Sequence, residues 1–235
     1  MNKIITTLVA ILIFSSSLVS AESQRSKEVI KMLENITWLG HDCFKIKGEK
    51  VIYTDPFKVK KGEPADIILI THEHYDHCSP EDVKKIRKDS TVIIATPDCA
   101  KKLSGNIKTI KPGDKITVEG INIEAVPAYN TNKQFHPKGN NWVGYIFTVM
   151  GQRIYIAGDT DYIKEMEGFK ADIALLPVSG IYVMTADEAA TAALAIKPKL
   201  AIPMHYGAIA GTEKDAKKFK ELLEGKVDVE ILKQQ

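Results

Sequence analysis

The sequence has few of the features that mark disulfide-stabilised or nucleic-acid-binding proteins. Three cysteines occur in 235 residues, and their odd number and irregular spacing do not predict a disulfide framework. The 32 Lys and Arg residues nearly balance the 30 Asp and Glu residues, and no long basic run occurs. Because nucleic-acid enzymes usually carry a basic surface that displaces counterions from phosphates, this balance disfavours a nucleic-acid partner and favours a small-molecule substrate.

The N-terminal segment contains the sequence's clearest targeting pattern. Met1, Asn2 and Lys3 precede an apolar stretch at residues 4–14, and a serine-rich stretch then ends at Ala21. This order is typical of a secretory signal peptide, whereas a membrane-spanning helix needs roughly 20 apolar residues. We therefore predict a signal peptide over residues 1–21 rather than a buried helix or an anchor. The protein would be exported, periplasmic or secreted, with no stable membrane anchor after cleavage.

The remaining residues alternate between short apolar segments and turn or helix-start signals. Strand-like segments occur at residues 36–39, 43–46, 51–54, 67–70, 91–95, 115–118, 121–126, 142–149, 153–156, 173–176 and 200–202. Helix starts are indicated by Ser79 with Pro80, by Thr185 with Glu188, and by Thr212 with Asp215. The pattern predicts an α+β fold, an αββα sandwich of two packed mixed sheets flanked by helices, in one domain over residues 22–235.

Ligand-type side chains follow the apolar run at residues 67–70 without a break. His72, His74, Asp76 and His77 occupy four of six consecutive positions, where the predicted strand gives way to a helix. In an extended segment His72 and His74 point the same way. Imidazoles and carboxylates suit Zn²⁺, Mn²⁺ or Fe²⁺. This density favours a metal site over a histidine-rich surface patch, and the loop has enough ligands for two ions.

The pattern His72-x-His74-x-Asp76-His77 after an apolar strand resembles the signature of the metallo-β-lactamase superfamily. Two later segments agree with it, at residues 158–161 and 203–207. The resemblance implies that Asp159 bridges two divalent metal ions, most simply zinc, with Mn or Fe as alternatives. It also implies that His205 binds the second ion, and it gives Asp161 a supporting role.

The superfamily usually supplies one more histidine just after a strand such as residues 121–126. This sequence has Tyr129 and Asn130 there, and the nearest histidine is His136. A loop can bring His136 back towards the metals, so we expect it to be a ligand, with a lid or substrate contact as the alternative.

His41 and Asp55 follow the first and third predicted strands. They resemble N-terminal elements of a branch that includes ascorbate-phosphate lactonases and a phospholipase D acting on N-acyl phosphatidylethanolamine. We expect them to support the ligands, because a ligating imidazole normally donates its other N–H to a carboxylate or carbonyl. Simple turn residues are the alternative.

The resemblance implies hydrolysis by a metal-bridging hydroxide, acting on a small ester, lactone or phosphoester. Asp76 and Asp159 are the expected catalytic carboxylates, with Asp76 orienting the hydroxide and passing its proton to the leaving group. Loop residues expected to line the substrate entrance are Asn130, Lys133, Lys138, Tyr182 and Tyr206. The alternatives are a mononuclear-iron persulfide dioxygenase of the same fold and a non-catalytic binding protein. The oligomeric state has no signal in the sequence.

Overall fold

The computed structural model describes residues 27–29 and 31–235. The predicted signal peptide, residues 1–21, lies outside these described residues. Helical turns at residues 27–29 and 31–33 lead into the first strand. Within this described part of the chain, no helix is both long and apolar enough to cross a membrane.

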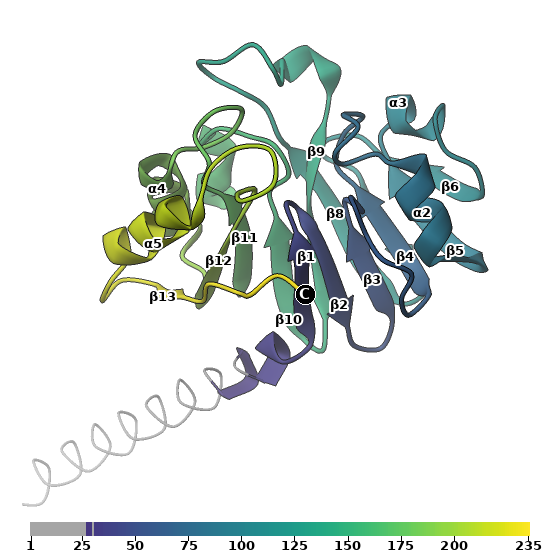
Figure 1. Ribbon diagram of the computed structural model, residues 1–235, viewed down its shortest axis with the longest axis horizontal. Helices are drawn as coiled ribbons and strands as arrows, with labels where there is room; N and C mark the ends of the chain where they lie inside the picture. Colours follow the sequence, from purple (N-terminus) through teal and green to yellow (C-terminus); the bar gives the residue numbers. More distant parts are fainter. Residues whose placement is uncertain (1–26, 30) are drawn as a thin grey trace, which may run out of the picture.

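Two mixed β-sheets packed face to face form the centre of the molecule (Figure 1). The first has the order β1-β2-β3-β4-β5-β6, with β1 (Ile36–Gly40), β2 (Cys43–Lys47), β3 (Val51–Thr54), β4 (Ala65–Ile70), β5 (Arg87–Ala95) and β6 (Asn106–Thr109). The second has the order β13-β12-β11-β10-β9-β8-β7, with β7 (Lys115–Val118), β8 (Ile121–Pro127), β9 (Val143–Val149), β10 (Gln152–Ile156), β11 (Ile173–Pro177), β12 (Leu200–Met204) and β13 (Asp228–Val229).

Helices cover the outer face of each sheet, which confirms the predicted αββα sandwich (Figure 1). Beside the first sheet lie α2 (Pro80–Ile86) and α3 (Pro97–Ala100); beside the second lie α4 (Ala186–Ile196) and α5 (Glu213–Leu222). Short 3₁₀ turns occur at η1 (Lys138–Asn140) and η2 (Lys164–Gly168). The three predicted helix starts are all present, because Ser79, Thr185 and Thr212 each accept a hydrogen bond from a first-turn backbone N–H.

The continuous apolar run in β4 reflects burial on both faces of its sheet. Ile67 and Leu69 point into the core between the two sheets, while Ile68 and Ile70 belong to a second cluster that includes Val83 of α2. Side chains alternate along a strand, so a strand covered on both sides must be apolar at every position. This firm anchoring fixes the start of the histidine-rich loop that follows.

Strand direction brings six loops to one edge of the sandwich. In the first sheet β1, β3 and β4 run the same way, because β2 pairs antiparallel with both β1 and β3, and β3 pairs parallel with β4. The same reasoning aligns β8, β10 and β12 in the second sheet. The loops after these strands carry the predicted site residues, as is usual for the carboxyl ends of strands in layered folds.

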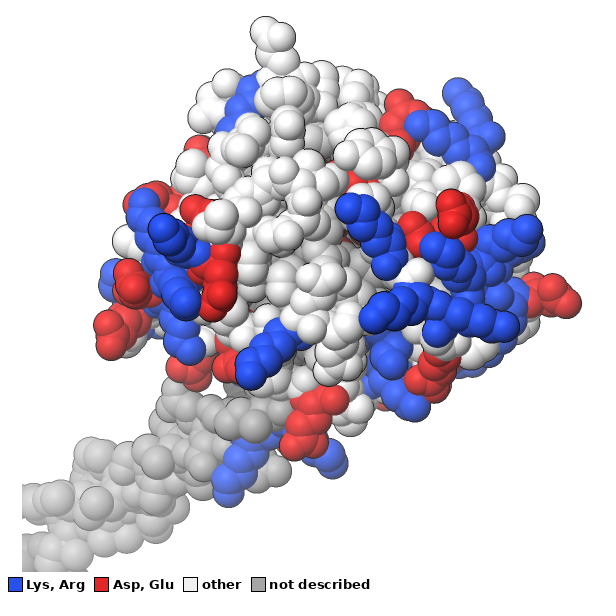
Figure 2. Space-filling view, viewed as in Figure 1, with Lys and Arg blue, Asp and Glu red and all other residues white. Residues whose placement is uncertain are grey.

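The surface carries charges of both signs. On the face that Figure 2 shows, acidic and basic side chains intermingle along the flanks, and the centre and upper part of this face are mostly uncharged.

Candidate metal centre

Nine side chains from these loops gather into a buried cluster. The histidine and aspartate atoms form overlapping groups whose possible ligand atoms all lie within 4.8 Å of one another. One group is His72, His74, His136 and Asp159, and another is His41, Asp76, His77 and His205. A third group joins Asp42 to His77 and Asp159, and Asp55 contacts His77 from behind. The cluster therefore contains every metal-binding residue that the sequence predicts.

The first group has the spacing expected of a metal site. Nδ1 of His74 lies 3.1 Å from Nε2 of His72 and 3.2 Å from Nε2 of His136. Oδ2 of Asp159 lies 3.3 Å from Nε2 of His136 and 3.9 Å from Nε2 of His72. Ligands about 2.0 Å from a tetrahedral ion are separated by about 3.3 Å. These side chains thus fit one metal ion, and we call their position the first metal position.

The second group receives the other oxygen of the same aspartate. Oδ1 of Asp159 lies 3.2 Å from Nε2 of His205 and 3.3 Å from Nε2 of His77. Oδ2 of Asp76 lies 3.7 Å from Nε2 of His77. His77 Nε2, His205 Nε2 and Asp159 Oδ1 are buried without a hydrogen-bond partner in the described chain. Buried polar atoms are rarely left unpaired, so this second metal position also fits a divalent ion.

The partners of the imidazoles fix which nitrogen faces the centre. Asp55 accepts hydrogen bonds from the hydroxyl of Thr71 at 2.7 Å and from Nδ1 of His77 at 3.0 Å. Because the Thr71 hydroxyl donates to Asp55, it accepts from Nδ1 of His72 at 2.9 Å. Nδ1 of His205 is 3.0 Å from the Ser179 hydroxyl. In His77 and His72, Nδ1 therefore holds the proton and Nε2 turns its lone pair towards the cluster. A serine hydroxyl can donate or accept, so Ser179 orients the His205 ring without fixing its tautomer.

His41 has the opposite arrangement. Its Nε2 lies 3.0 Å from Oδ2 of Asp76, and a carboxylate can only accept, so Nε2 carries the proton. The backbone carbonyl of His41 accepts hydrogen bonds from the N–H of His205 and from the indole of Trp38. These contacts match the supporting position expected of His41, since they hold Asp76 and His205 in place.

Three residues of this centre have a strained backbone conformation. His41, Asp55 and His205 have φ values of 53°, 34° and 59°, a region that residues other than glycine rarely adopt. Each follows directly on a strand end, where the chain must turn sharply to aim a side chain inward. Such strain costs free energy and is characteristic of functional sites.

Burial and mutual charge shift the protonation of these groups. Burial lowers the pKa of His41 and of His136 to about 4. Burial also opposes protonation of His205, but the Asp159 carboxylate outweighs it and raises the His205 pKa to about 8. Burial alone would raise the pKa of Asp159, yet His205 and His77 hold it well below its usual value. Asp159 is therefore an anion in the ligand cluster.

Asn130 and Asp161 hold the loop that carries His136. Oδ1 of Asn130 accepts from the backbone N–H of His136 at 3.0 Å and lies 3.3 Å from its Nδ1. Nδ2 of Asn130 donates to Oδ1 of Asp161, and the N–H of Thr131 donates to Oδ2. Asp161 thus acts on His136 through Asn130, and Asn130 is itself buried, although it was predicted at the substrate entrance.

The other predicted entrance residues have protein partners. Lys133 Nζ lies 2.5 Å from Oδ1 of Asp161, and Lys138 Nζ lies 3.1 Å from Oε1 of Glu165. Tyr206 is buried with its ring 4.8 Å from that of Trp38. Both lysines are therefore already paired with carboxylates.

Apolar and aromatic side chains surround the cluster instead. The Trp142 ring lies 5.0 Å, 4.8 Å and 5.2 Å from those of His72, His74 and His136. Exposed apolar side chains lie on three of the loops that carry the ligands, at Tyr75, Phe135 and Ile209, and Ile181 lies on the loop after β11. Tyr182 stacks edge-on with Phe135 at 4.7 Å. We call the exposed apolar side chains of these loops the mouth of the cluster.

Sequence reasoning missed Asp42, Ser179 and Trp142. Asp42 directly follows His41 in the turn between β1 and β2, and burial raises its pKa to about 7. Its position beside a site histidine was the available signal. Ser179 and Trp142 are far from any motif in the sequence, and their roles become visible through contacts with His205 and with the first metal position.

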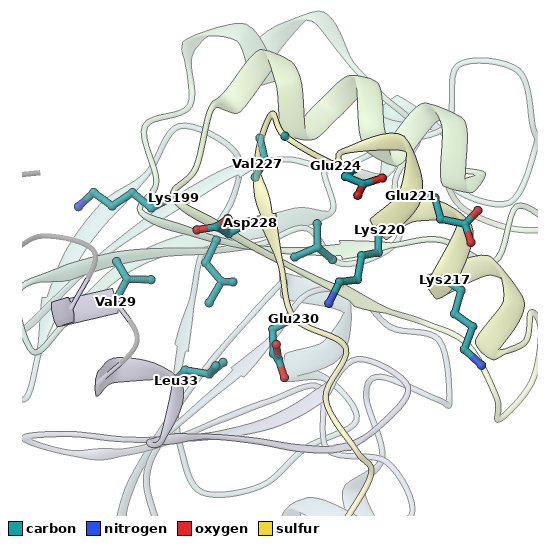
Figure 3. Close-up of a pocket in the computed structure, with 13 residues that line it drawn as sticks. Val29, Leu33, Lys199, Lys217, Lys220, Glu221, Glu224, Val227, Asp228 and Glu230 are labelled. Atoms are coloured by element: carbon teal, nitrogen blue, oxygen red, sulfur yellow. The ribbon is translucent and has the colours of Figure 1, made fainter. Parts of the chain in front are cut away.

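A groove of about 660 Å³ lies away from this centre, between the N-terminal turns, α5 and β13 (Figure 3). Val29, Leu33 and Val227 form apolar parts of its wall, and Lys and Glu side chains surround them. None of the ligand-type residues of the metal centre lines it.

Comparisons with known proteins agree with this geometry. Residues 35–205 match a family model described as a beta-lactamase superfamily domain. A metal-dependent hydrolase of Thermoplasma acidophilum is 39% identical over 203 residues, which is 80% of this chain and 89% of that protein. A crystal structure of a putative metal-dependent hydrolase from Parabacteroides distasonis is 40% identical with a TM-score of 0.77, covering 85% of this chain and 93% of that one. A metallo hydrolase from Ignicoccus hospitalis, 24% identical, has the same fold with a TM-score of 0.71 over 85% of this chain and 94% of that one.

Proposed function

This chain is a metal-dependent hydrolase of the metallo-β-lactamase superfamily, and we propose that it uses two divalent ions to cleave a small ester, lactone or phosphoester. The observation that carries the proposal is the position of Asp159. Its Oδ2 faces His72 and His136, and its Oδ1 faces His77 and His205. One carboxylate turned towards two separate ligand groups is the arrangement that a two-metal hydrolase needs.

Bound divalent ions would supply a hydroxide nucleophile at neutral pH and would polarise the substrate's reacting oxygen. Nε2–H of His41 holds Oδ2 of Asp76, so that this carboxylate keeps a fixed orientation at the second position. Although burial raises the pKa of Asp76, its hydrogen bond to His41 and the charge of His77 lower it overall. Asp76 is thus an ionised acceptor that can orient a water molecule and pass a proton to the leaving group.

The residues at the mouth favour a neutral ester or lactone with an apolar substituent over an anionic phosphoester. Lys133 and Lys138, the lysines predicted at the substrate entrance, are paired with Asp161 and Glu165 rather than free to bind an anion. Tyr75 and Phe135 instead offer exposed aromatic surface to a substrate. Zinc suits the imidazole-rich first position, with Mn or Fe as alternatives.

The dioxygenase alternative requires a single iron, for which one of the two ligand groups would suffice. If the iron occupied the first position, His205 and Asp76 of the second group would have no metal to bind. Their side chains are nevertheless held in a fixed orientation by Ser179 and His41. A non-catalytic binding protein would equally lack a reason for this arrangement. Both alternatives therefore explain fewer of the contacts than the hydrolase does.

Metal analysis with a substrate screen on residues 22–235 tests the proposal. We expect two ions per chain and turnover of p-nitrophenyl acetate or a simple lactone. Asp159→Asn should lower hydrolysis on the order of 100-fold or more and release metal, because it removes the shared ligand. Asp159→Asn with wild-type metal content and activity would overturn the two-metal assignment. One iron per chain with persulfide-dependent oxygen uptake would support the dioxygenase instead.

A further inference from the structure

Asp42 lies behind the second metal position, in the turn between β1 and β2. Its backbone carbonyl accepts a hydrogen bond from the Thr54 hydroxyl at 2.8 Å, which fixes the turn against β3. The residue has no exposed surface. One of its carboxylate oxygens lies within 4.8 Å of ligand atoms of both His77 and Asp159. The side chain is thus aimed at the metal centre from the protein interior.

The Asp42 carboxylate differs from its neighbours because neither oxygen has a hydrogen-bond partner in the described chain. Asp55, which is equally buried, accepts hydrogen bonds from Thr71 and His77. Moving an ionised carboxylate out of water is strongly unfavourable unless hydrogen-bond donors or a cation replace the solvent. A divalent cation shared with His77 and Asp159 is the partner that fits this environment.

We propose that Asp42 is a further ligand of the second metal position, together with His77 and Asp159. The inference rests on the two-metal function proposed above and adds an oxygen donor to one side of the centre. Imidazoles dominate the first position, whereas the second would take carboxylates from Asp42, Asp76 and Asp159. Oxygen-rich sites suit Mn²⁺ better than imidazole-rich sites do. The two positions therefore differ in metal preference, and the second selects the harder ion.

Metal binding to chelator-stripped protein at pH 8 tests the role of Asp42, with Mn²⁺ alone and Zn²⁺ alone as probes. Bound Mn²⁺ is counted by electron paramagnetic resonance of the free ion, and Zn²⁺ by competition with a chromophoric chelator. We expect two Mn²⁺ per wild-type chain, and in Asp42→Asn a second Mn²⁺ that binds at least tenfold more weakly. Asp172→Asn, at an ion pair with Lys199 outside the centre, should match the wild type.

Thermal unfolding distinguishes a metal-ligating role of Asp42 from a purely structural one. Metal-free Asp42→Asn should unfold at a higher temperature than the metal-free wild type, because it lacks an unpaired buried charge. Added Mn²⁺ should raise the Tm of the variant by less than it raises the Tm of the wild type. A lower Tm when stripped, with the full increase on adding Mn²⁺, would overturn the proposal. If Asp42→Asn does not fold, Asp42→Ala gives the same comparison.

The two proposals fail in different ways. A wild-type chain that binds fewer than two ions of either metal overturns both the two-metal function and the role of Asp42. A wild-type chain that binds two ions, with an Asp42→Asn affinity within twofold of it, overturns only the role of Asp42.

Discussion

His77 and Asp55 are joined by a hydrogen bond that has no contact with solvent. Nδ1 of His77 lies 3.0 Å from Oδ2 of Asp55, and both side chains are fully buried. Asp55 is held in turn by the backbone N–H and the hydroxyl of Thr71, the residue that opens the histidine-rich loop. The pair ties the end of β3 to the loop after β4 and leaves Nε2 of His77 free for a metal.

Asp55→Asn should therefore weaken metal binding at the second metal position. An amide can donate as well as accept, so it no longer fixes the proton of His77 on Nδ1. We expect the affinity for the second ion to fall about 10- to 100-fold, with less effect on the first. Titration of stripped protein with Zn²⁺ measures both affinities. Asp66→Asn, at an ion pair with Lys88 near the start of β4 and β5, is the control; equal affinities in both variants would contradict the prediction.

Trp142 should report on the first metal position. Its ring lies about 5 Å from those of His72, His74 and His136, and Trp38→Phe removes the chain's other indole. In that background, His136→Ala should lower the affinity of the first metal position on the order of 100-fold, because the position loses one of its three imidazole ligands. The fluorescence response to added Zn²⁺ should disappear with it. A His136→Ala chain with an unchanged response would remove His136 from the ligand set.

Metal affinity should increase with pH up to about 8. In the metal-free protein burial disfavours protonated His205, but Asp159 raises its pKa to about 8, so below that value a proton occupies the nitrogen that a metal needs. The folded-state pKa exceeds the unfolded value of about 6.5. This histidine therefore stabilises the metal-free fold most below pH 6.5 and loses that contribution as the pH rises through 8.

Calorimetric titration with Zn²⁺ at pH 6, 7 and 8 checks this sign, because buffers of different ionisation enthalpy reveal the released protons. His205→Gln should release fewer protons and show a flatter dependence on pH. Proton release that is identical in this variant and the wild type would mean that His205 does not carry the competing proton.

Local sequence patterns were enough to predict the αββα fold and most of the metal-binding residues. The run at residues 67–70 and the ligands at positions 72–77 are contiguous, so one strand end fixes them together. Asp159 likewise lies three residues after the end of β10, and His205 follows β12 directly. Strand β6 has mostly exposed side chains, β13 has two residues, and α3 forms one short turn, so none of the three has the apolar periodicity that a sequence pattern requires.

Long-range contacts could not be predicted in the same way. His136 reaches His74, 62 positions away, by way of an irregular loop that Asn130 and Asp161 hold. Its place depends on those contacts rather than on spacing. Asp42 looks like an ordinary turn aspartate in the sequence, and its burial without a partner becomes visible when β1, β2 and the second sheet are assembled.

We predict that residues 1–21, which precede the described part of the chain, direct export of the protein. If residues 4–14 form the apolar part of a signal peptide, Val9→Asp with Leu12→Asp should block export, because each charge opposes transfer into an apolar phase by about 2.5 to 3.5 kcal/mol. The full chain, expressed in a bacterium with two membranes, should appear in the periplasm with Glu22 as its first residue. Ser26→Asp, beyond the cleavage site, is the control. Full-length cytoplasmic protein would contradict the prediction.

Gly158 should be intolerant of a side chain because of Thr71. Its φ is +61°, and a Cβ placed there would lie 2.9 Å from Cβ and Cγ2 of Thr71. Thr71 orients both Asp55 and His72, so Gly158→Ala should disturb the centre as well as the backbone. We expect a loss of about 2 to 4 kcal/mol in the free energy of unfolding, together with weaker metal binding.

Gly151 provides the matched control, since its φ is +73° and nothing lies within 4 Å of an added Cβ. Gly151→Ala should cost about 1 to 2 kcal/mol from backbone conformation alone and should leave metal affinity unchanged. Urea unfolding of the stripped and Zn²⁺-loaded forms gives both quantities for each variant. The prediction is contradicted if the two variants lose equal stability and bind Zn²⁺ equally well. Thr71 would then have moved to make room for the new side chain. The packing of Gly158 against Thr71 would not be what holds Asp55 and His72 in place.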